Sequence, residues 1–271
     1  MPELPEVESV VRYLRPYVTG KSISKLLHHN EYSNVFSSHS PEDISQIVSG
    51  QIIQKMWRRG KYIIFTLGAG YVFVHLRMTG HLTTSVKFKD RKYITAEMVF
   101  SDRSSLYFKD FRKFGRFGYS DNIKHVNQLV GVEPLSSVFS FPYLQRELKK
   151  YKRQIKPLLL NQGFICGLGN IYVDECLWMA RIHPKTISNN LPKKNIEVLY
   201  SSIISVLNEA ISLKGTTIIN FNYAANREGE FGQHLNVYGR AGQPCYRCKK
   251  TIKKIFVGQR GTCFCVNCQG G

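Results

Sequence analysis

The segment CYRCKKTIKKIFVGQRGTCFCVNC, residues 245–268, decides the fold of the C-terminal part of the chain. It holds two Cys-x2-Cys pairs separated by 16 residues, Cys245 with Cys248 and Cys265 with Cys268. Four cysteines at this spacing predict a structural zinc site, because the protein fills all four tetrahedral ligand positions. The residues between the pairs should form a β-hairpin that contains Arg260-Gly261. The basic residues of this hairpin would suit phosphate groups: Lys250, Lys253, Lys254 and Arg260.

Three further cysteines lie outside the two pairs. Cys263 lies close enough in sequence to Cys265 to be an alternative zinc ligand. Cys265 is the better choice, because it forms a Cys-x2-Cys pair with Cys268. Cys166 and Cys176 are expected to be small buried hydrophobes. Residues 1–8 are acidic and lack the apolar stretch of a signal peptide, and no apolar run reaches the length of a membrane span. We therefore expect the cytosol, where thiols stay reduced.

The charge of the chain indicates a polyanionic partner. Lys and Arg number 38 against 19 Asp and Glu, which gives a net charge of +19 on 271 residues. Nucleic acid is the first candidate, and a merely solubilising charge is the alternative. Clustering favours nucleic acid, since basic residues gather at 57–61, 112–113, 149–153 and 249–254. Binding to a membrane surface is less expected, because no basic amphipathic helix stands out in the sequence.

The chain begins Met1-Pro2-Glu3-Leu4-Pro5-Glu6. Removal of Met1 would leave Pro2 with a free secondary amine, and an α-amino group titrates near ~7.7–8.0, so a useful fraction is neutral and nucleophilic. Glu3 and Glu6 are candidates for proton transfer. The alternative is an ordinary helix start, with proline and acidic residues in the first turn.

The N-terminal half should contain one helix followed by short strands. Residues 5–18 predict a helix, because apolar residues recur at intervals of three or four. From 21 to 120, brief apolar runs separated by turns predict an all-β sandwich or barrel. These runs lie at 52–53, 62–65, 71–74, 98–100 and 106–108.

Three polar stretches lie at the ends of these strands. Arg58–Tyr62 offers Lys61 as a phosphate-contacting or catalytic lysine, or else a solvated strand entrance. His75–Gly80 offers Met78 as a wedge into a base stack, or else a core residue. Asp110–Gly115 offers Arg112 beside an aromatic residue, which could fill the hole left by an extruded base or form a surface cation–π pair.

The C-terminal half should be helical. Helices are expected over about 141–152, 157–163, 168–180 and 192–213, and a long loop over 215–240 that is either functional or disordered. The turn Gly167–Gly169 opens a helix and could cradle a phosphate, although such a motif is weak alone. We place domains at 1–131, 132–240 and 241–271: a β-sandwich domain, a helical DNA-binding domain and a four-cysteine zinc finger.

Six motifs occur together and in order along the whole chain. They are MPELPEVE, RRGKY, HLRMTG, DFRKFG, GLGNIYVDE and the four-cysteine segment. In this combination the chain resembles the bacterial formamidopyrimidine-DNA glycosylases. The form Leu4-Pro5-Glu6 is similar to that family rather than to endonuclease VIII, its relative that acts on pyrimidine lesions.

The resemblance implies a fold, an activity and a partner. The fold would be α+β: an N-terminal β-sandwich with an N-terminal helix, a helix–two-turn–helix domain and a C-terminal β-hairpin zinc finger. The activity would be excision of oxidised purines, chiefly 8-oxoguanine and formamidopyrimidines, followed by strand cleavage through β,δ-elimination. The partner would be double-stranded DNA with oxidised bases or abasic sites, bound by a monomer that needs no membrane. Preference for oxidised pyrimidines, or a non-catalytic zinc-finger DNA-binding module, are the alternatives.

The resemblance also assigns roles to residues. It makes Pro2 the Schiff-base nucleophile, Glu3 the proton donor and Glu6 a support of the same site. Lys61 would serve β-elimination and phosphate contact, and Arg260 would serve δ-elimination and phosphate grip. The remaining assignments concern DNA binding. Gap-filling residues would be Met78, Arg112 and Phe114, and backbone contacts would be His75, Asn170 and Lys152 or Arg153.

The chain departs from its relatives at three places. Tyr93-Ile94-Thr95 stands where relatives carry a His-x-His pair. Phe111 stands where they often carry proline. The loop at 221–232, which the resemblance places over the flipped base, has an unfamiliar sequence.

Overall fold

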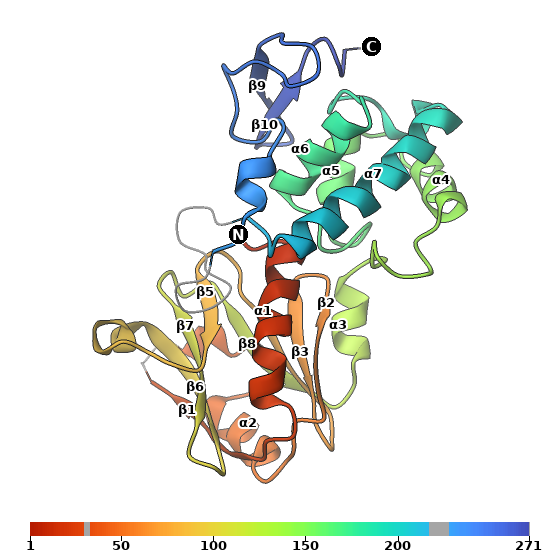
Figure 1. Ribbon diagram of the computed structural model, residues 1–271. Coiled ribbons are helices and arrows are strands. Elements are labelled where there is room, and N and C mark those ends of the chain that lie inside the picture. The colour runs from red at the N-terminus through yellow and green to blue at the C-terminus, as the bar shows by residue number, and fades with distance from the viewer. Residues whose placement is uncertain (30–32, 217–227, 271) are drawn as a thin grey trace. The chain divides into compact units, whose positions relative to one another are not determined.

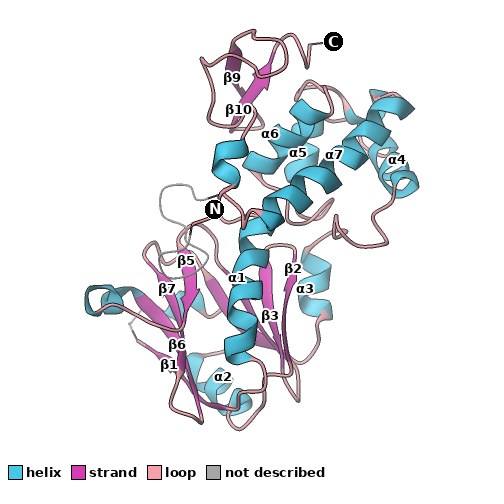
Figure 2. Cartoon of the chain, in the orientation of Figure 1, coloured by secondary structure: helices cyan, strands magenta, loops and turns pink. Residues whose placement is uncertain are grey.

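The computed structural model describes residues 1–29, 33–216 and 228–270 (Figure 1). The chain divides into two compact units. The first holds residues 1–128 and 214–229, and the second holds residues 129–213 and 230–271. As Figure 2 shows, strands dominate the first unit and helices the second.

The first unit is a β-sandwich of two four-stranded antiparallel sheets. One sheet has the order β1 (Ile23–His28), β6 (Ile94–Phe100), β7 (Ser105–Asp110), β5 (Gly80–Thr83). The other has the order β2 (Lys55–Arg59), β3 (Tyr62–Thr66), β4 (Tyr71–His75), β8 (Arg116–Ser120). The short helices of this unit are α2 (Pro41–Val48) and α3 (Lys124–Leu129), with 3-10 turns η1 (Ser33–Val35) and η2 (Phe88–Tyr93).

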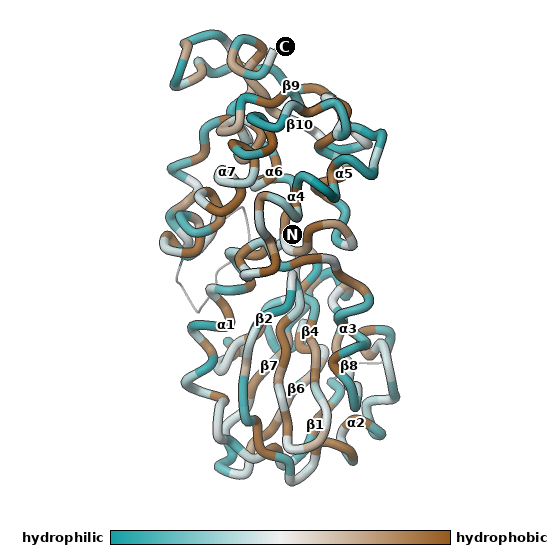
Figure 3. Tube along the Cα trace, turned by 90° about the vertical axis from the view of Figure 1, so that its right-hand side faces the viewer, coloured by the Kyte–Doolittle hydropathy of each residue, from teal (hydrophilic) through white to brown (hydrophobic). Residues whose placement is uncertain are grey.

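A single hydrophobic core joins the two sheets to α1 (Leu4–Val18). Helix α1 packs on β2 and β3, and its residues Val7, Val10 and Leu14 are fully buried. Side chains alternate along β3: Ile63 faces this core, whereas Ile64 joins Val126 of α3 on the opposite face. The middle of β3 is therefore buried on both faces, and in Figure 3 hydrophobic and hydrophilic segments alternate along the chain of this unit.

The second unit is built around α6 (Asn170–Met179), whose residues from 171 to 178 are all buried. It packs against α5 (Ile155–Leu160), α7 (Lys193–Ser212) and a hairpin strand. The hairpin consists of β9 (Ile252–Val257) and β10 (Arg260–Cys265), and α4 (Phe141–Lys149) packs on α7. The unit also holds the 3-10 turns η3 (Ser188–Asn190) and η4 (Phe231–His234). None of the described helices is both long and apolar enough to span a bilayer.

Most expected elements form, with three corrections. The run Ile52-Ile53 is not a strand: Ile52 makes a single bridge with Ser22, and β2 begins at Lys55. The helix expected at 157–163 runs over Ile155–Leu160, because a proline is tolerated at the third helical position. Strands β1, β5 and β8, and helices α2 and α3, were not expected.

Candidate functional site

Two buried carboxylates follow Pro2 in the sequence at the start of α1, and Pro2 is itself buried. Glu3 is 3% exposed and Glu6 is 2% exposed. One oxygen of Glu6 accepts the Glu3 backbone N–H at 2.9 Å. The other accepts the backbone N–H of Thr216 at 2.7 Å and its hydroxyl at 3.1 Å. Glu6 thus links the chain start to residues far along the sequence.

This link requires glycine at position 215. Gly215 has a φ of +80°, and a Cβ there would lie 2.6 Å from Glu6 Oε1. Within the expected loop at 215–240, a Cβ on Gly229 would lie 2.2 Å from the Gly215 carbonyl oxygen. Gly215, which is beside Glu6, and Gly229 therefore approach each other closely. Residues 217–227, with most of the 221–232 loop, lie outside the described part of the chain.

Lys61 lies at the tight turn between β2 and β3, and it is 3% exposed. The alternative of a solvated strand entrance is therefore wrong for this side chain. Arg58 fixes the turn, because it donates to the Gly60 carbonyl at 3.1 Å and to Glu8 of α1 at 3.0 Å. Although burial raises the pKa of Glu8, hydrogen bonds from Arg12 and the charge of Arg58 hold it below its ordinary value. An ionised Glu8 thus ties α1 to the strand that leads into the Lys61 turn.

His75 ends β4 directly opposite Tyr62, with ring centroids 4.7 Å apart. Its Nδ1 accepts the backbone N–H of Arg77 at 3.0 Å. Burial, followed by the charges of Arg77 and Lys61, lowers the pKa of His75 to about 3. The ring is therefore neutral at physiological pH. Because Nδ1 acts as an acceptor, the hydrogen resides on Nε2, which can donate to an anionic oxygen.

This neutral histidine predicts a pH dependence of stability. The unfolded chain binds a proton at His75 below its ordinary pKa of 6.5, whereas the folded chain does so only near pH 3. The contribution of His75 to the free energy of unfolding should therefore be complete above pH 6.5. It should fall on acidification by up to about 1.4 kcal/mol per pH unit. Denaturant titrations of wild type and His75→Gln between pH 7 and 4 should diverge, whereas the exposed His39→Gln should follow wild type. Parallel curves for His75→Gln and wild type would contradict a neutral His75.

Three expected gap-filling side chains meet at the surface of the first unit. Arg112 donates to the Met78 sulfur at 3.1 Å, and its guanidinium lies 4.8 Å from the centroid of the Phe114 ring. Met78 is 47% exposed and Phe114 is 46% exposed, so Met78 is not a core residue. The surface cation–π pair also forms. Two turns that are distant in sequence thus present one cluster, called here the wedge: Met78, Arg112 and Phe114.

Asp110 fixes the two turns of the wedge, and the sequence did not single it out. This carboxylate, 1% exposed, accepts the Gly115 N–H at 2.6 Å, the Arg112 N–H at 3.2 Å and the Thr79 hydroxyl at 2.5 Å. A Cβ on Gly115 would lie 2.4 Å from the Phe108 ring, so the turn closes only on glycine. An aspartate that directly precedes a Gly-ended turn was the available signal.

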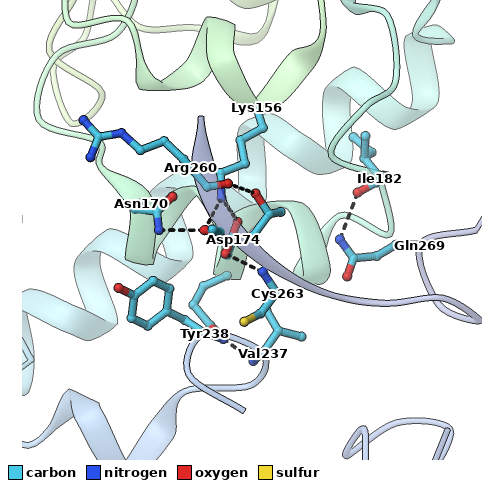
Figure 4. A network of polar contacts seen from close by, with 12 residues as sticks. Lys156, Asn170, Asp174, Ile182, Val237, Tyr238, Arg260, Cys263 and Gln269 are labelled. Carbon is cyan, nitrogen blue, oxygen red and sulfur yellow. Dashed lines mark hydrogen bonds and ion pairs between the residues drawn. The ribbon is translucent and has the colours of Figure 1, made fainter. Parts of the chain in front are cut away.

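The second unit places Asn170 and Arg260 on adjoining elements (Figure 4). Asn170 donates to the Gly261 carbonyl at 2.9 Å. Lys156 and Asp174, both essentially unexposed, form an ion pair at 2.6 Å. Asp174 also accepts the Cys263 N–H at 2.9 Å, so the start of α6 holds β10. The Arg260 side chain is exposed and extends away from this ion pair in Figure 4.

The other expected backbone contacts of the second unit are also accessible. Lys152 and Arg153 are exposed just before α5, as are Lys250, Lys253 and Lys254 around the hairpin. The sequence did not single out Lys156 or give Asp174 a role. The available signal was a lysine inside the otherwise apolar helix IKPLLL. The expected site residues are thus distributed over both units.

The four cysteines at 245, 248, 265 and 268 form one cluster, with their sulfur atoms within 4.8 Å of one another. Cys245 and Cys268 are 3.9 Å apart at sulfur, and Cys248 and Cys265 are 3.4 Å apart. Sulfur ligands at ~2.3 Å around a tetrahedral ion are about 3.8 Å apart. The cluster could therefore hold a metal ion. Cys263 is not part of it, and Cys166 and Cys176 are buried as expected.

Family models match most of the chain. The formamidopyrimidine-DNA glycosylase N-terminal domain matches residues 1–117, and the formamidopyrimidine-DNA glycosylase H2TH domain matches residues 130–222. A formamidopyrimidine-DNA glycosylase of Lactobacillus delbrueckii subsp. bulgaricus is 40% identical over 276 residues, which cover 99% of each chain.

Solved structures are similar over the full length. A mutant Lactococcus lactis FPG in complex with DNA that contains Fapy-dG has a TM-score of 0.90 and 36% identity, with 100% of each chain covered. A MutM protein in complex with DNA that contains carbocyclic 8-oxo-G has a TM-score of 0.88 and 37% identity, again with 100% of each chain covered.

Proposed function

Because the chain belongs to the formamidopyrimidine-DNA glycosylase family, we propose that it excises oxidised purines from double-stranded DNA and then cleaves the strand. One observation carries the proposal: the two carboxylates that follow Pro2 in the sequence, Glu3 and Glu6, are both buried, and the chain as a whole is strongly basic. Similar proteins have been solved with DNA that contains Fapy-dG or an 8-oxo-G analogue, which supports this lesion class. We also infer that it acts as a monomer in the cytoplasm, where it would meet chromosomal DNA.

The chemistry begins once Met1 is removed and the Pro2 nitrogen becomes a free amine. That nitrogen attacks C1′ of the damaged nucleotide, the bond from C1′ to the base breaks, and the base leaves with a proton. Glu3 is the proton donor at the sugar. Glu6 acts through hydrogen bonds, because it holds the Glu3 amide and Thr216. It is therefore a positioning residue.

A proton delivered to O4′ then breaks the C1′–O4′ bond and opens the sugar ring, which leaves an iminium between the Pro2 nitrogen and C1′. This iminium permits strand cleavage. Loss of a C2′ proton expels the 3′ phosphate in the β-elimination, and a second elimination expels the 5′ phosphate. Lys61 is proposed for the first step and Arg260 for the second, and both contact phosphate. Hydrolysis of the iminium then releases the amine, so no step requires a redox cofactor.

Extrusion of the nucleotide exposes the target bond but costs a few kcal/mol in lost stacking. We propose that the wedge fills the vacated space and offsets part of this cost. His75, through Nε2, the exposed Lys152 and Arg153, and the half-buried Asn170 would hold the phosphate backbone.

Replacement of the proposed proton donor should slow base excision. Glu3→Gln keeps the shape of the side chain but cannot supply a proton, so we expect single-turnover excision of 8-oxoguanine to slow by about 100- to 10,000-fold. Glu42→Gln, on the exposed first turn of α2, is the control and should react like wild type. If Glu3→Gln excised the base at the wild-type rate, another group would be the proton donor.

We also propose that the four-cysteine cluster holds one structural Zn2+. All four ligands come from the protein, so the ion would stabilise the hairpin and take no part in the chemistry. Elemental analysis of the purified protein should find one zinc per chain, and Cys268→Ser should lose it together with most DNA affinity. Cys176→Ser, a buried cysteine outside the cluster, should keep the metal. Full zinc content in Cys268→Ser would contradict the assignment.

The lesion class is tested by comparing duplexes that carry 8-oxoguanine, a formamidopyrimidine or thymine glycol. We expect excision of the first two to be faster, with borohydride trapping a covalent protein–DNA adduct. Faster excision of thymine glycol would instead assign the chain a pyrimidine preference. Tight binding without excision or trapping would indicate a non-catalytic DNA-binding protein.

A further inference from the structure

An exposed aromatic pair lies next to the wedge in sequence and takes no part in it. Phe111 immediately precedes Arg112 on the turn after β7, and it is 64% exposed. Its ring meets the ring of Tyr93, the last residue of η2, with centroids 4.9 Å apart and planes 62° apart. Most of the Phe111 side chain is thus open to solvent, so its free ring face is available for contact with another molecule.

The pair is held in place from two sides. Asp110 fixes the backbone on one side of Phe111 through its bonds to the turn. Tyr93 leads directly into β6, whose first residue Ile94 pairs with Lys109 of β7. Thr95, which follows, is fully buried and donates its hydroxyl to the Phe108 carbonyl at 3.0 Å, so it faces inwards. The aromatic pair is therefore a fixed surface on the sandwich.

The charge around the pair is positive. Lys92 Nζ lies 5.1 Å from the centroid of the Tyr93 ring. Exposed cations flank both rings in sequence: Arg91, Lys92, Arg112 and Lys113. The nearest acidic residues in sequence are engaged, since Asp110 binds its own turn and Asp90 pairs with Lys109 at 3.4 Å. Aromatic rings set among cations are typical of surfaces that stack nucleic-acid bases.

We propose that Phe111, supported by Tyr93, is a stacking platform for an undamaged DNA base beside the extruded nucleotide. This inference rests on the proposed function. A base that loses its stacking neighbour exposes a π face, and Phe111 stands next in the chain to a wedge residue. Stacking on a ring involves no hydrogen bonds to base edges. The platform should therefore add the same binding affinity whichever lesion the DNA carries.

Binding of a duplex with a tetrahydrofuran abasic analogue tests the platform without any chemistry. Phe111→Leu keeps apolar bulk but removes the ring, and we expect its Kd to rise about 5- to 10-fold. Phe111→Trp should bind within about twofold of wild type, because it keeps an aromatic face. The control Phe88→Leu removes an 88% exposed ring from η2 and should leave the Kd unchanged.

Two further readouts separate stacking from a general loss of structure. The slope of log Kd against log salt should be the same in Phe111→Leu and wild type, because no phosphate contact is lost. Fluorescence of 2-aminopurine placed beside or opposite the analogue should be quenched by wild type and by Phe111→Trp, and recover in Phe111→Leu. An unchanged Kd and unchanged quenching in Phe111→Leu would overturn the platform.

The same proteins separate this inference from the proposed function. Phe111→Leu at saturating concentration should still form the borohydride-trapped adduct. If wild type traps normally while Phe111→Leu binds and quenches like wild type, only the platform is wrong. If wild type traps no adduct at all, the proposed function is wrong, and the binding measurements still decide whether the ring stacks on DNA.

Discussion

A chain extended by one residue before Pro2 is expected to lose at least about 1,000-fold in single-turnover excision and to form almost no borohydride-trapped adduct. The extension turns the reactive nitrogen into an amide, which has no basic lone pair to attack C1′. Pro2→Gly leaves a free terminal amine, yet it should also trap far less, because it lacks the secondary amine. Mass spectrometry must first show that Met1 is absent from the wild-type protein.

The control for the extended chain is binding to the abasic-analogue duplex, which requires no nucleophile. Its Kd should stay within a few-fold of wild type, so that the loss can be attributed to chemistry. Efficient trapping by a chain that keeps a residue before Pro2 would rule out Pro2 as the nucleophile, whatever the fold.

Lys156→Met is expected to lower the free energy of unfolding by about 3–5 kcal/mol, because it leaves Asp174 buried without its cation. Burial already raises the pKa of Asp174 to about 6 even with Lys156 beside it. Without Lys156 this pKa rises further, so the folded state holds the proton more tightly than the unfolded chain. The loss of unfolding free energy in Lys156→Met relative to wild type should therefore be smaller at pH 5 than at pH 8. Urea denaturation at both pH values measures this difference.

Two variants make this prediction specific. Lys156→Met combined with Asp174→Asn removes the unpaired charge but keeps an acceptor for the Cys263 N–H, so it should recover much of the lost stability. Lys150→Met breaks an exposed pair with Glu147 and should change stability little. A Lys156→Met protein that unfolds at the wild-type urea concentration would contradict a stabilising buried pair.

Much of the fold could be predicted from the sequence, because its elements have strong local signals. The apolar spacing in residues 5–18 and 193–212 indicated helices that the structure contains, and the cysteine spacing indicated the hairpin. Strand β1 was missed because a register shift between Ile23 and Lys25 breaks its alternation. Helix α2 was missed although Ser40 caps it, accepting the Asp43 N–H at 3.1 Å.

The site was predictable as a set of residues but not as an arrangement. The burial of Lys61 depends on packing around a turn whose sequence, Arg-Arg-Gly-Lys, looks solvated. The wedge depends on Asp110 meeting Thr79, and the support of Arg260 depends on Lys156 meeting Asp174. Such pairings are set by tertiary structure, and no local pattern encodes them.

The carboxylate of Glu6 has an evolutionary consequence. Its two oxygens serve two segments: the amide of Glu3, next to the proposed nucleophile, and the backbone at Thr216, which lies 210 positions after Glu6. A mutation that moves either segment also disturbs the hydrogen bonds of the other. A substitution that shifts the start of α1 is therefore expected to require a compensating substitution near Thr216.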